Sequence, residues 1–153
     1  MEKDEDLERC IISQLDLLQS LAFAKFILEK QLHERATVDE EKKLIHLAFN
    51  TALIVSYCRP FHRNKSNQGT ARRPSLPSSS LDIFTADERK LHDLIIKSRD
   101  KEYAHSDLES YNMLISQFKG IQIPISRDPF IPLNRDSITQ LISIIEKLVA
   151  KIS

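Results

Sequence analysis

TADERKLHDLIIKSRDKEYAHSD, residues 85–107, combines a helix start with a dense group of charged side chains. Thr85 and Glu88 have the spacing of a capping box, in which the threonine oxygen accepts a backbone amide and the glutamate reaches back to the cap. The segment therefore predicts a helix over about residues 86–106. One stripe of this helix carries His92, Ile96, Arg99 and Tyr103.

Three further helices are predicted from apolar periodicity and from residues that begin or end helices. The first covers about residues 4–34, which contain neither glycine nor proline. The second begins at a capping box formed by Thr37 and Glu40 and ends before Pro60, because proline pushes the preceding residue out of the helical region. The last covers about residues 134–151. Their predicted core-facing residues are Leu7, Ile11, Leu15, Leu18, Ala22, Ile27 and Leu28 in the first helix, Leu44, Leu47, Ala48, Thr51, Val55 and Cys58 in the second, and Ile138, Leu141, Ile142, Ile145, Leu148 and Val149 in the last.

Four helices with these apolar faces most simply form an up-and-down bundle, so the predicted fold class is all-α. Two connections differ in composition from the helices. Residues 59–80, RPFHRNKSNQGTARRPSLPSSS, are rich in serine, proline and arginine and are predicted to form a flexible basic loop. Between the last two helices, YNMLISQF and IQIPIS within residues 111–126 could pair as a short β-hairpin.

The composition is that of one globular domain covering residues 1–153, with 41% hydrophobic and 29% charged residues. Only 2 glycines and no tryptophan favour helices over a turn-rich β fold. No apolar run approaches the ~20 residues that cross a bilayer, and the N-terminus is acidic where a signal peptide is basic. Cys10 and Cys58 lack secretory or metal-type spacing, so we expect a cytoplasmic protein without membrane contact.

Charge is distributed unevenly although the formal net charge is zero. Residues 1–41 contain 5 Lys and Arg against 11 Asp and Glu, whereas residues 42–81 contain 7 against none. A basic stretch inside a neutral protein attracts an anionic partner. The candidate contacts to RNA phosphates are therefore Arg59, His62, Arg63 and Lys65, although an ordinary solubilising loop explains them equally well.

Arg99 and His105 are the candidates for chemistry. If the helix continues through both, they lie about 9 Å apart along its axis and ~120° apart around it, so they do not meet easily within one chain. Two copies packed about a two-fold axis could bring them into one cleft, which predicts a homodimer. An arginine fork matches phosphate oxygens, and histidine takes and gives protons near neutral pH. Together they suit attack of an RNA 2′-hydroxyl on the neighbouring phosphate without a metal, with Asp100 orienting either group.

In Arg99, the polar Asp100 after it and His105 after five intervening residues, the sequence resembles the HEPN superfamily of small all-α domains. LHDLIIKSRDKEYAHSD, with YCRPFHRN upstream, also resembles a set of bacterial proteins of similar length. The resemblance implies a dimeric, metal-independent endoribonuclease, often of a toxin–antitoxin, abortive-infection or other defence system, with catalytic Arg99 and His105, a supporting Asp100 and an antitoxin protein as partner. A subset of these toxins carries a tyrosine two residues after the histidine, which a partner nucleotidyltransferase modifies. That position is Asp107 here, which argues against this route of inactivation.

Other interpretations of the same residues stay open. Arg99, Asp100 and His105 could form a structural network, since basic side chains are favourable near a helix C-terminus. His92 and Tyr103 could line the RNA site, but we expect an ordinary surface or interface histidine and a tyrosine packed in the core. No zinc-like spacing and no glycine-rich phosphate loop are present, so no metal or other cofactor is predicted. The leading alternative function is a non-catalytic helical module that binds RNA, a nucleotide or a protein partner, and a third is a structural bundle whose loop recruits a partner.

Overall fold

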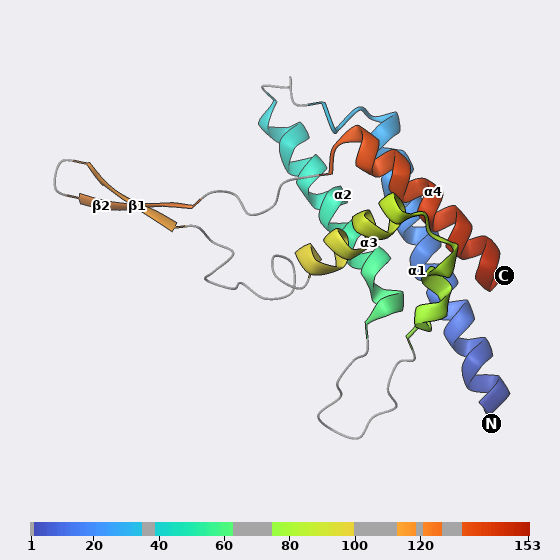
Figure 1. Cartoon of the computed structure of the whole chain (residues 1–153). Coiled ribbons are helices and arrows are strands. Elements are labelled where there is room, and N and C mark those ends of the chain that lie inside the picture. The colour runs from blue at the N-terminus through green and yellow to red at the C-terminus, as the bar shows by residue number, and fades with distance from the viewer. Residues whose placement is uncertain (1, 35–38, 63–74, 100–112, 119–120, 127–132) are drawn as a thin grey trace.

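The computed structural model describes residues 2–34, 39–62, 75–99, 113–118, 121–126 and 133–153. These residues are mostly helical, which confirms the predicted all-α class. The four α-helices are α1 (Glu2–Glu29), α2 (Glu40–Cys58), α3 (Ala86–Ser98) and α4 (Arg135–Ile152) (Figure 1). Of two short 3-10 helices, η1 (Arg59–Phe61) lies within the predicted basic loop, and η2 (Ser78–Ile83) begins within it and extends beyond its end.

The helices pack around one apolar core. α1 packs along α2 and along α4, and α3 contacts both α2 and α4. This arrangement brings the end of α2, η1 and α3 together, although they are separated in the sequence (Figure 1). The fully buried apolar side chains at the centre are Leu17, Ala24, Ile27, Leu53, Tyr57, Cys58, Ile138, Leu141, Ile144, Ile145 and Leu148.

The cap of α3 is confirmed, whereas the predicted cap of α2 is wrong. The Thr85 hydroxyl accepts the Glu88 amide at 3.2 Å, and the Glu88 carboxylate accepts the Thr85 amide at 2.9 Å. At α2 the capping carboxylate belongs to Asp39, which accepts the amides of the second and third helical residues at 3.0 and 3.3 Å. Thr37 itself lies outside the described residues. Aspartate is at least as good a cap as threonine, so the cap lies two residues later than the capping box predicts.

Two predicted helix ends also differ from the structure. α1 ends at Glu29 instead of about residue 34, because Gln31 adopts a positive φ of 52°. The Leu32 amide then donates to the Ile27 carbonyl at 3.0 Å, which closes the helix in the manner of a Schellman motif without a glycine to signal it. α3 ends at Ser98, and the rest of the predicted helix, from residue 100, lies outside the described residues.

Most of the face of α1 that was predicted to point into the core points outward, although the predicted Ile27 is fully buried and the predicted Leu28 is half-buried. Leu7, Ile11, Leu15 and Leu18 are 43–62% exposed. The true core face carries Leu17, Ala24 and Ile27, but also polar residues such as Ser13, Asp16 and Ser20. The outer stripe is therefore the more regular of two apolar stripes on α1. A prediction based only on the spacing of apolar residues chooses the outer stripe as the core face.

The predicted face of α4 is confirmed, and that of α2 is shifted. Ile138, Leu141, Ile145 and Leu148 of α4 are fully buried. In α2 the predicted Leu44 is 68% exposed, whereas the predicted Cys58 is fully buried. The other buried side chains, which include Asn50, Leu53, Ile54 and Tyr57, were not predicted. The buried face is hard to recognise from the sequence because it contains the polar Asn50. The side-chain oxygen of Asn50 accepts the Leu133 amide at 3.1 Å, which holds the segment before α4 against α2.

A partly buried ion pair joins α3 to α4, with the Lys147 side chain 40% exposed. The Lys147 Nζ atom lies 2.7 and 2.8 Å from the two oxygens of Glu88, whose side chain is only 7% exposed. We expect Lys147→Met to lower the free energy of unfolding by about 2 kcal/mol, because it leaves a buried carboxylate without its counter-ion while keeping the side-chain volume. Urea unfolding at pH 7 measures this loss.

Lys25→Met is the matched control for that variant. Lys25 pairs with Glu146 at 3.2 Å, but both side chains are more than half exposed, so we expect a change below about 0.5 kcal/mol. Equal losses in the two variants would contradict the role of Lys147 as the counter-ion of the buried Glu88 carboxylate.

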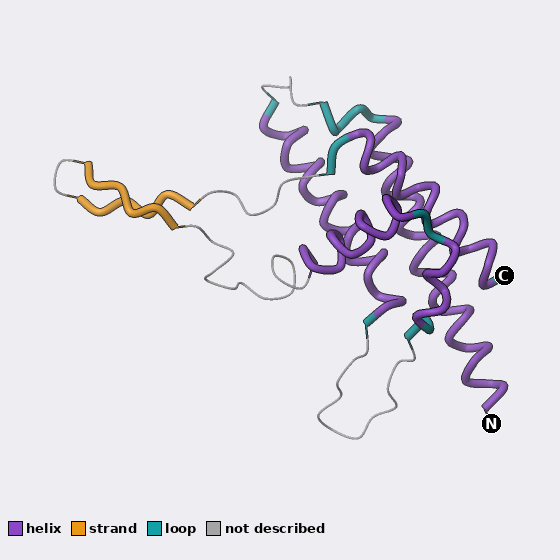
Figure 2. The backbone as a smooth tube through the Cα atoms, viewed as in Figure 1, coloured by secondary structure: helices purple, strands orange, loops and turns teal. Residues whose placement is uncertain are grey.

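The predicted hairpin is present. β1 (Met113–Phe118) pairs antiparallel with β2 (Ile121–Ser126), and the register runs from Met113 opposite Ser126 to Phe118 opposite Ile121. Figure 2 shows the hairpin set apart from the helices.

One helical stretch is longer and more apolar than the sequence analysis allowed. Leu7–Glu29 of α1 meets the length and composition of a membrane-spanning helix. The core helix of a soluble protein and a signal sequence near the N-terminus both pass the same test. Leu17, Ala24 and Ile27 within this stretch are fully buried against the other helices, although only 33% of the apolar stretch is buried. The expectation that no apolar stretch of the chain approaches the length of a membrane-spanning helix is therefore wrong.

Candidate functional site

Two sequence segments that were singled out separately meet in space. The Tyr57 hydroxyl, at the end of α2, lies 2.8 Å from the Nδ1 atom of His92 on α3. The Phe61 ring of η1 lies 4.7 Å from the His92 ring and 5.4 Å from the Tyr57 ring, measured between centroids. Phe84, just after η2, adds a third aromatic neighbour to His92 at 5.7 Å. YCRPF and LHDL are therefore two parts of one aromatic cluster.

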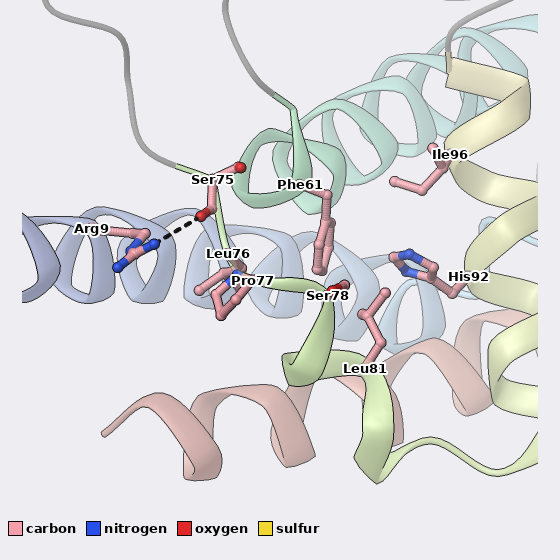
Figure 3. Close-up of a pocket in the computed structure, with 9 residues that line it drawn as sticks. All are labelled: Arg9, Phe61, Ser75, Leu76, Pro77, Ser78, Leu81, His92 and Ile96. Atoms are coloured by element: carbon pink, nitrogen blue, oxygen red, sulfur yellow. Dashed lines mark hydrogen bonds between the residues drawn. The ribbon is translucent and has the colours of Figure 1, made fainter.

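This cluster forms one wall of a cleft of about 510 Å³, a volume in the usual range of small-molecule sites. Figure 3 shows His92 and Ile96 of α3 on one side and Arg9 of α1 on the other, with Phe61 and the start of η2 between them. The lining combines apolar, hydroxyl, imidazole and guanidinium groups: Arg9, Phe61, Ser75, Leu76, Pro77, Ser78, Leu81, His92 and Ile96.

His92 is a buried residue, so the expectation of an ordinary surface or interface histidine is wrong. It is only 4% exposed. Burial lowers its pKa to about 4, with a smaller raising effect from Asp93 and a lowering effect from Arg89. Burial also raises the pKa of Tyr57 well above its usual value. Both partners are therefore uncharged at neutral pH, and the hydrogen bond between them is a neutral one.

The low pKa of His92 makes the fold less stable in mild acid. Between about pH 6.5 and pH 4 the unfolded chain binds a proton at this residue that the folded chain does not, so stability falls as pH falls. We expect wild-type protein to lose roughly 2–3 kcal/mol of unfolding free energy between pH 7 and pH 4.5 from this group. Urea unfolding at both pH values measures the loss.

His92→Phe is the comparison for that experiment, because it keeps a ring but does not titrate. The variant loses the hydrogen bond to Tyr57, which lowers its unfolding free energy at every pH. The pH dependence that remains comes from other groups, such as His46, because burial lowers the pKa of His46 as well. An unchanged difference between pH 7 and pH 4.5 in the variant would contradict the assignment to His92.

Arg99 lies on the face of α3 that carries the cleft residues. His92, Ile96 and Arg99 follow at intervals of four and three residues, so they lie on one stripe, and His92 and Arg99 are about 10 Å apart along the helix axis. Arg99 is half-buried, and its amide donates to carbonyls of the last helical turn. Arg99 itself is not among the residues that line the cleft. Its predicted catalytic companions Asp100 and His105 lie outside the described residues.

The predicted phosphate contacts are only partly described. Arg59 lies at the end of α2 with 44% of its side chain exposed, and its Nη1 atom is 3.4 Å from the Asp16 carboxylate and 3.5 Å from the Gln19 side-chain oxygen. His62 follows η1 and is half-buried. The remaining candidates, Arg63, Lys65 and Tyr103, lie outside the described residues.

Several cleft residues had no signal in the sequence. Arg9 belongs to the acidic N-terminal part of the chain and reaches the Ser75 carbonyl at 3.4 Å, which only the fold of α1 against the 75–78 segment could show. Ser75 and Ser78 lie in a stretch of similar small residues. Within the described ranges, no group of three or more His, Cys, Asp or Glu side chains is placed to hold a metal ion.

Comparisons with known proteins add no family to these observations. The chain matches none of the models of protein families, none of the curated proteins and none of the solved structures with which it was compared.

Proposed function

We propose that the protein is a metal-independent endoribonuclease of the HEPN type, built on a four-helix up-and-down bundle, in which RNA lies along α3 from the cleft to Arg99. One observation carries the proposal. His92 and Ile96 line a cleft of nucleotide size, and Arg99 follows on the same helical stripe about 10 Å further along the axis. That distance suits a base in the cleft and a nearby phosphate at the arginine.

The reaction uses three protein groups beyond those that bind RNA. His105 accepts the proton of the RNA 2′-hydroxyl, whose oxygen then bonds to the neighbouring phosphorus, while the bond from phosphorus to the 5′-oxygen breaks. The departing 5′-oxygen takes up a proton, so the products are a 2′,3′-cyclic phosphate and a 5′-hydroxyl. Arg99 stabilises the charge on the phosphate oxygens, and Asp100 orients the arginine or the histidine.

The proposal includes a homodimer and an RNA-holding loop. Arg99 of one protomer and His105 of its partner converge about a two-fold axis, because the two side chains do not meet easily within one helix. Basic residues of the loop that follows α2, beginning at Arg59, hold flanking phosphates. A role in defence, with an antitoxin as partner, belongs to the same proposal.

The test is RNA cleavage without metal. Purified protein is incubated with RNA in EDTA, and the new ends are analysed. We expect 2′,3′-cyclic phosphate ends from the wild-type protein and none from His105→Ala at unchanged melting temperature. Intact RNA after incubation with folded wild-type protein would contradict the catalytic proposal.

A second candidate is a non-catalytic module that binds RNA or a nucleotide. The observation that favours it is that the cleft is formed by residues of a single chain, so ligand binding there needs neither His105 nor a second protomer. Binding of RNA without cleavage, lost when the cleft is changed, would support this module over the enzyme.

A further inference from the structure

The buried pair of Tyr57 and His92 has one arrangement of protons that leaves no buried hydroxyl unsatisfied. Both side chains are uncharged, so the 2.8 Å contact is made either by the tyrosine O–H or by the histidine Nδ1–H. In the second case the tyrosine proton would need another acceptor, and no other described residue accepts it. A buried donor without an acceptor is costly, so the tyrosine donates to Nδ1.

This arrangement fixes the other nitrogen of His92 as a donor. A neutral imidazole with a bare Nδ1 carries its proton on Nε2. Nε2 makes no hydrogen bond to a described residue. It is also not among the fully buried polar atoms that lack a partner, so this atom of the largely buried His92 is open on the side of the cleft that His92 lines (Figure 3). An N–H group that opens on the cleft donates to water in the free protein and can donate to an acceptor of a bound ligand in its place.

We propose that Tyr57 and His92 contact the exocyclic group at C4 of a pyrimidine or C6 of a purine, and so select uracil or guanine, which carry a carbonyl oxygen there, over cytosine or adenine. Where uracil and guanine carry a carbonyl oxygen, cytosine and adenine carry an amino group, so the Nε2–H donor would face a second donor. The apolar side chains of Phe61, Leu81 and Ile96 supply the surface against which a flat ring packs. The inference rests on the proposed RNA substrate and names the base it holds.

The test measures binding of single nucleotides, not cleavage. UMP, CMP, GMP and AMP are titrated separately into the wild-type protein and followed by NMR. We expect UMP to bind about tenfold more tightly than CMP and GMP about tenfold more tightly than AMP, since the wrong base leaves a buried donor unpaired. The ribonucleotide of 2-pyrimidinone, which has neither the carbonyl nor the amino group at that position, should bind with intermediate affinity. Equal affinities for UMP and CMP in the wild-type protein would overturn the proposal, whether or not any variant folds.

Two variants assign the selectivity to the pair. His92→Phe keeps a ring but removes the donor, so we expect the UMP-to-CMP ratio to fall to about one. Tyr57→Phe frees the imidazole to place its proton on either nitrogen, so we expect a partial loss. His46→Gln, at a histidine of α2 that does not line the cleft, should leave the ratio unchanged. Full selectivity in folded His92→Phe would overturn the assignment.

A direct reading of the tautomer completes the experiment. ¹⁵N NMR of the histidine rings distinguishes a protonated Nε2 from a protonated Nδ1, and we expect the proton of His92 on Nε2 at pH 7. The opposite tautomer would overturn the inference. These measurements need no reaction, so they test base selection separately from catalysis. Selective UMP binding without RNA cleavage would refute the enzyme and retain the base-selecting cleft. RNA cleavage without selective binding would refute the base-selecting cleft and retain the enzyme.

Discussion

Arg99→Ala is expected to reduce RNA cleavage by about 10²–10³-fold, the size of effect seen when one group that stabilises transition-state charge is removed. The reason is the place of Arg99 on the stripe of His92 and Ile96, beyond the residues that line the cleft, where a phosphate next to the bound base would lie. The variant should stay folded, because Arg99 follows the last residue of α3 and is only half-buried. Initial rates on a fluorescent RNA in EDTA, with a melting curve for each protein, measure both quantities.

Two further variants distinguish a specific role of the Arg99 guanidinium from a non-specific effect of positive charge on α3. Arg99→Lys keeps the charge but loses the planar pair of donors, so we expect a loss closer to that of alanine than to wild-type activity. Arg89→Ala removes an exposed arginine from the same helix, one that pairs with Asp93 at 3.2 Å, and should change the rate less than twofold. Equal effects at Arg89 and Arg99 would mean that charge on α3 acts only by long-range attraction.

Leu17→Ala is expected to lower the free energy of unfolding by about 3 kcal/mol and the melting temperature by roughly 10 °C. Leu17 is fully buried between α1 and its neighbours, so truncation removes apolar contact and leaves a cavity in a packed core. Leu15, two residues earlier on the same helix, is 62% exposed. Leu15→Ala should therefore change the unfolding free energy by no more than about 0.5 kcal/mol.

This pair of variants decides which apolar stripe of α1 faces the core. Urea unfolding at several protein concentrations gives the unfolding free energy of each variant. A loss at Leu15 as large as that at Leu17 would contradict the described packing and would mean that the outer stripe of Leu7, Ile11, Leu15 and Leu18 is covered in solution.

The sequence predicted those elements that are encoded by local signals. The capping box at Thr85, the apolar face of α4 and the pairing of the two strands each depend on residues that are close in the chain. Tertiary structure decided the rest. The core faces of α1 and α2 contain Asp16 and Asn50, whose hydrogen bonds to other segments make buried polar residues acceptable.

The candidate site shows the same division. His92 and Arg99 were found on one stripe by helical spacing, and the structure places the first of them in the cleft. The aromatic contact of His92 with Tyr57 and Phe61 depends on α3 packing against the end of α2, and Arg9 reaches the cleft from the far end of the chain. No spacing rule connects residues that only the tertiary fold brings together.

The account depends most on the claim that RNA lies along the cleft and the stripe of His92, Ile96 and Arg99. The direct measurement is NMR titration of the methyl-labelled protein with a short RNA whose 2′-hydroxyls are methylated, which prevents cleavage by 2′-hydroxyl attack. We expect the methyl signals of Ile96, Leu76 and Leu81, which line the cleft, to shift with one common affinity, while those of Leu15 on the outer face of α1 stay in place. Shifts confined to the outer face of α1 or to α4, with the cleft signals unchanged, would contradict it.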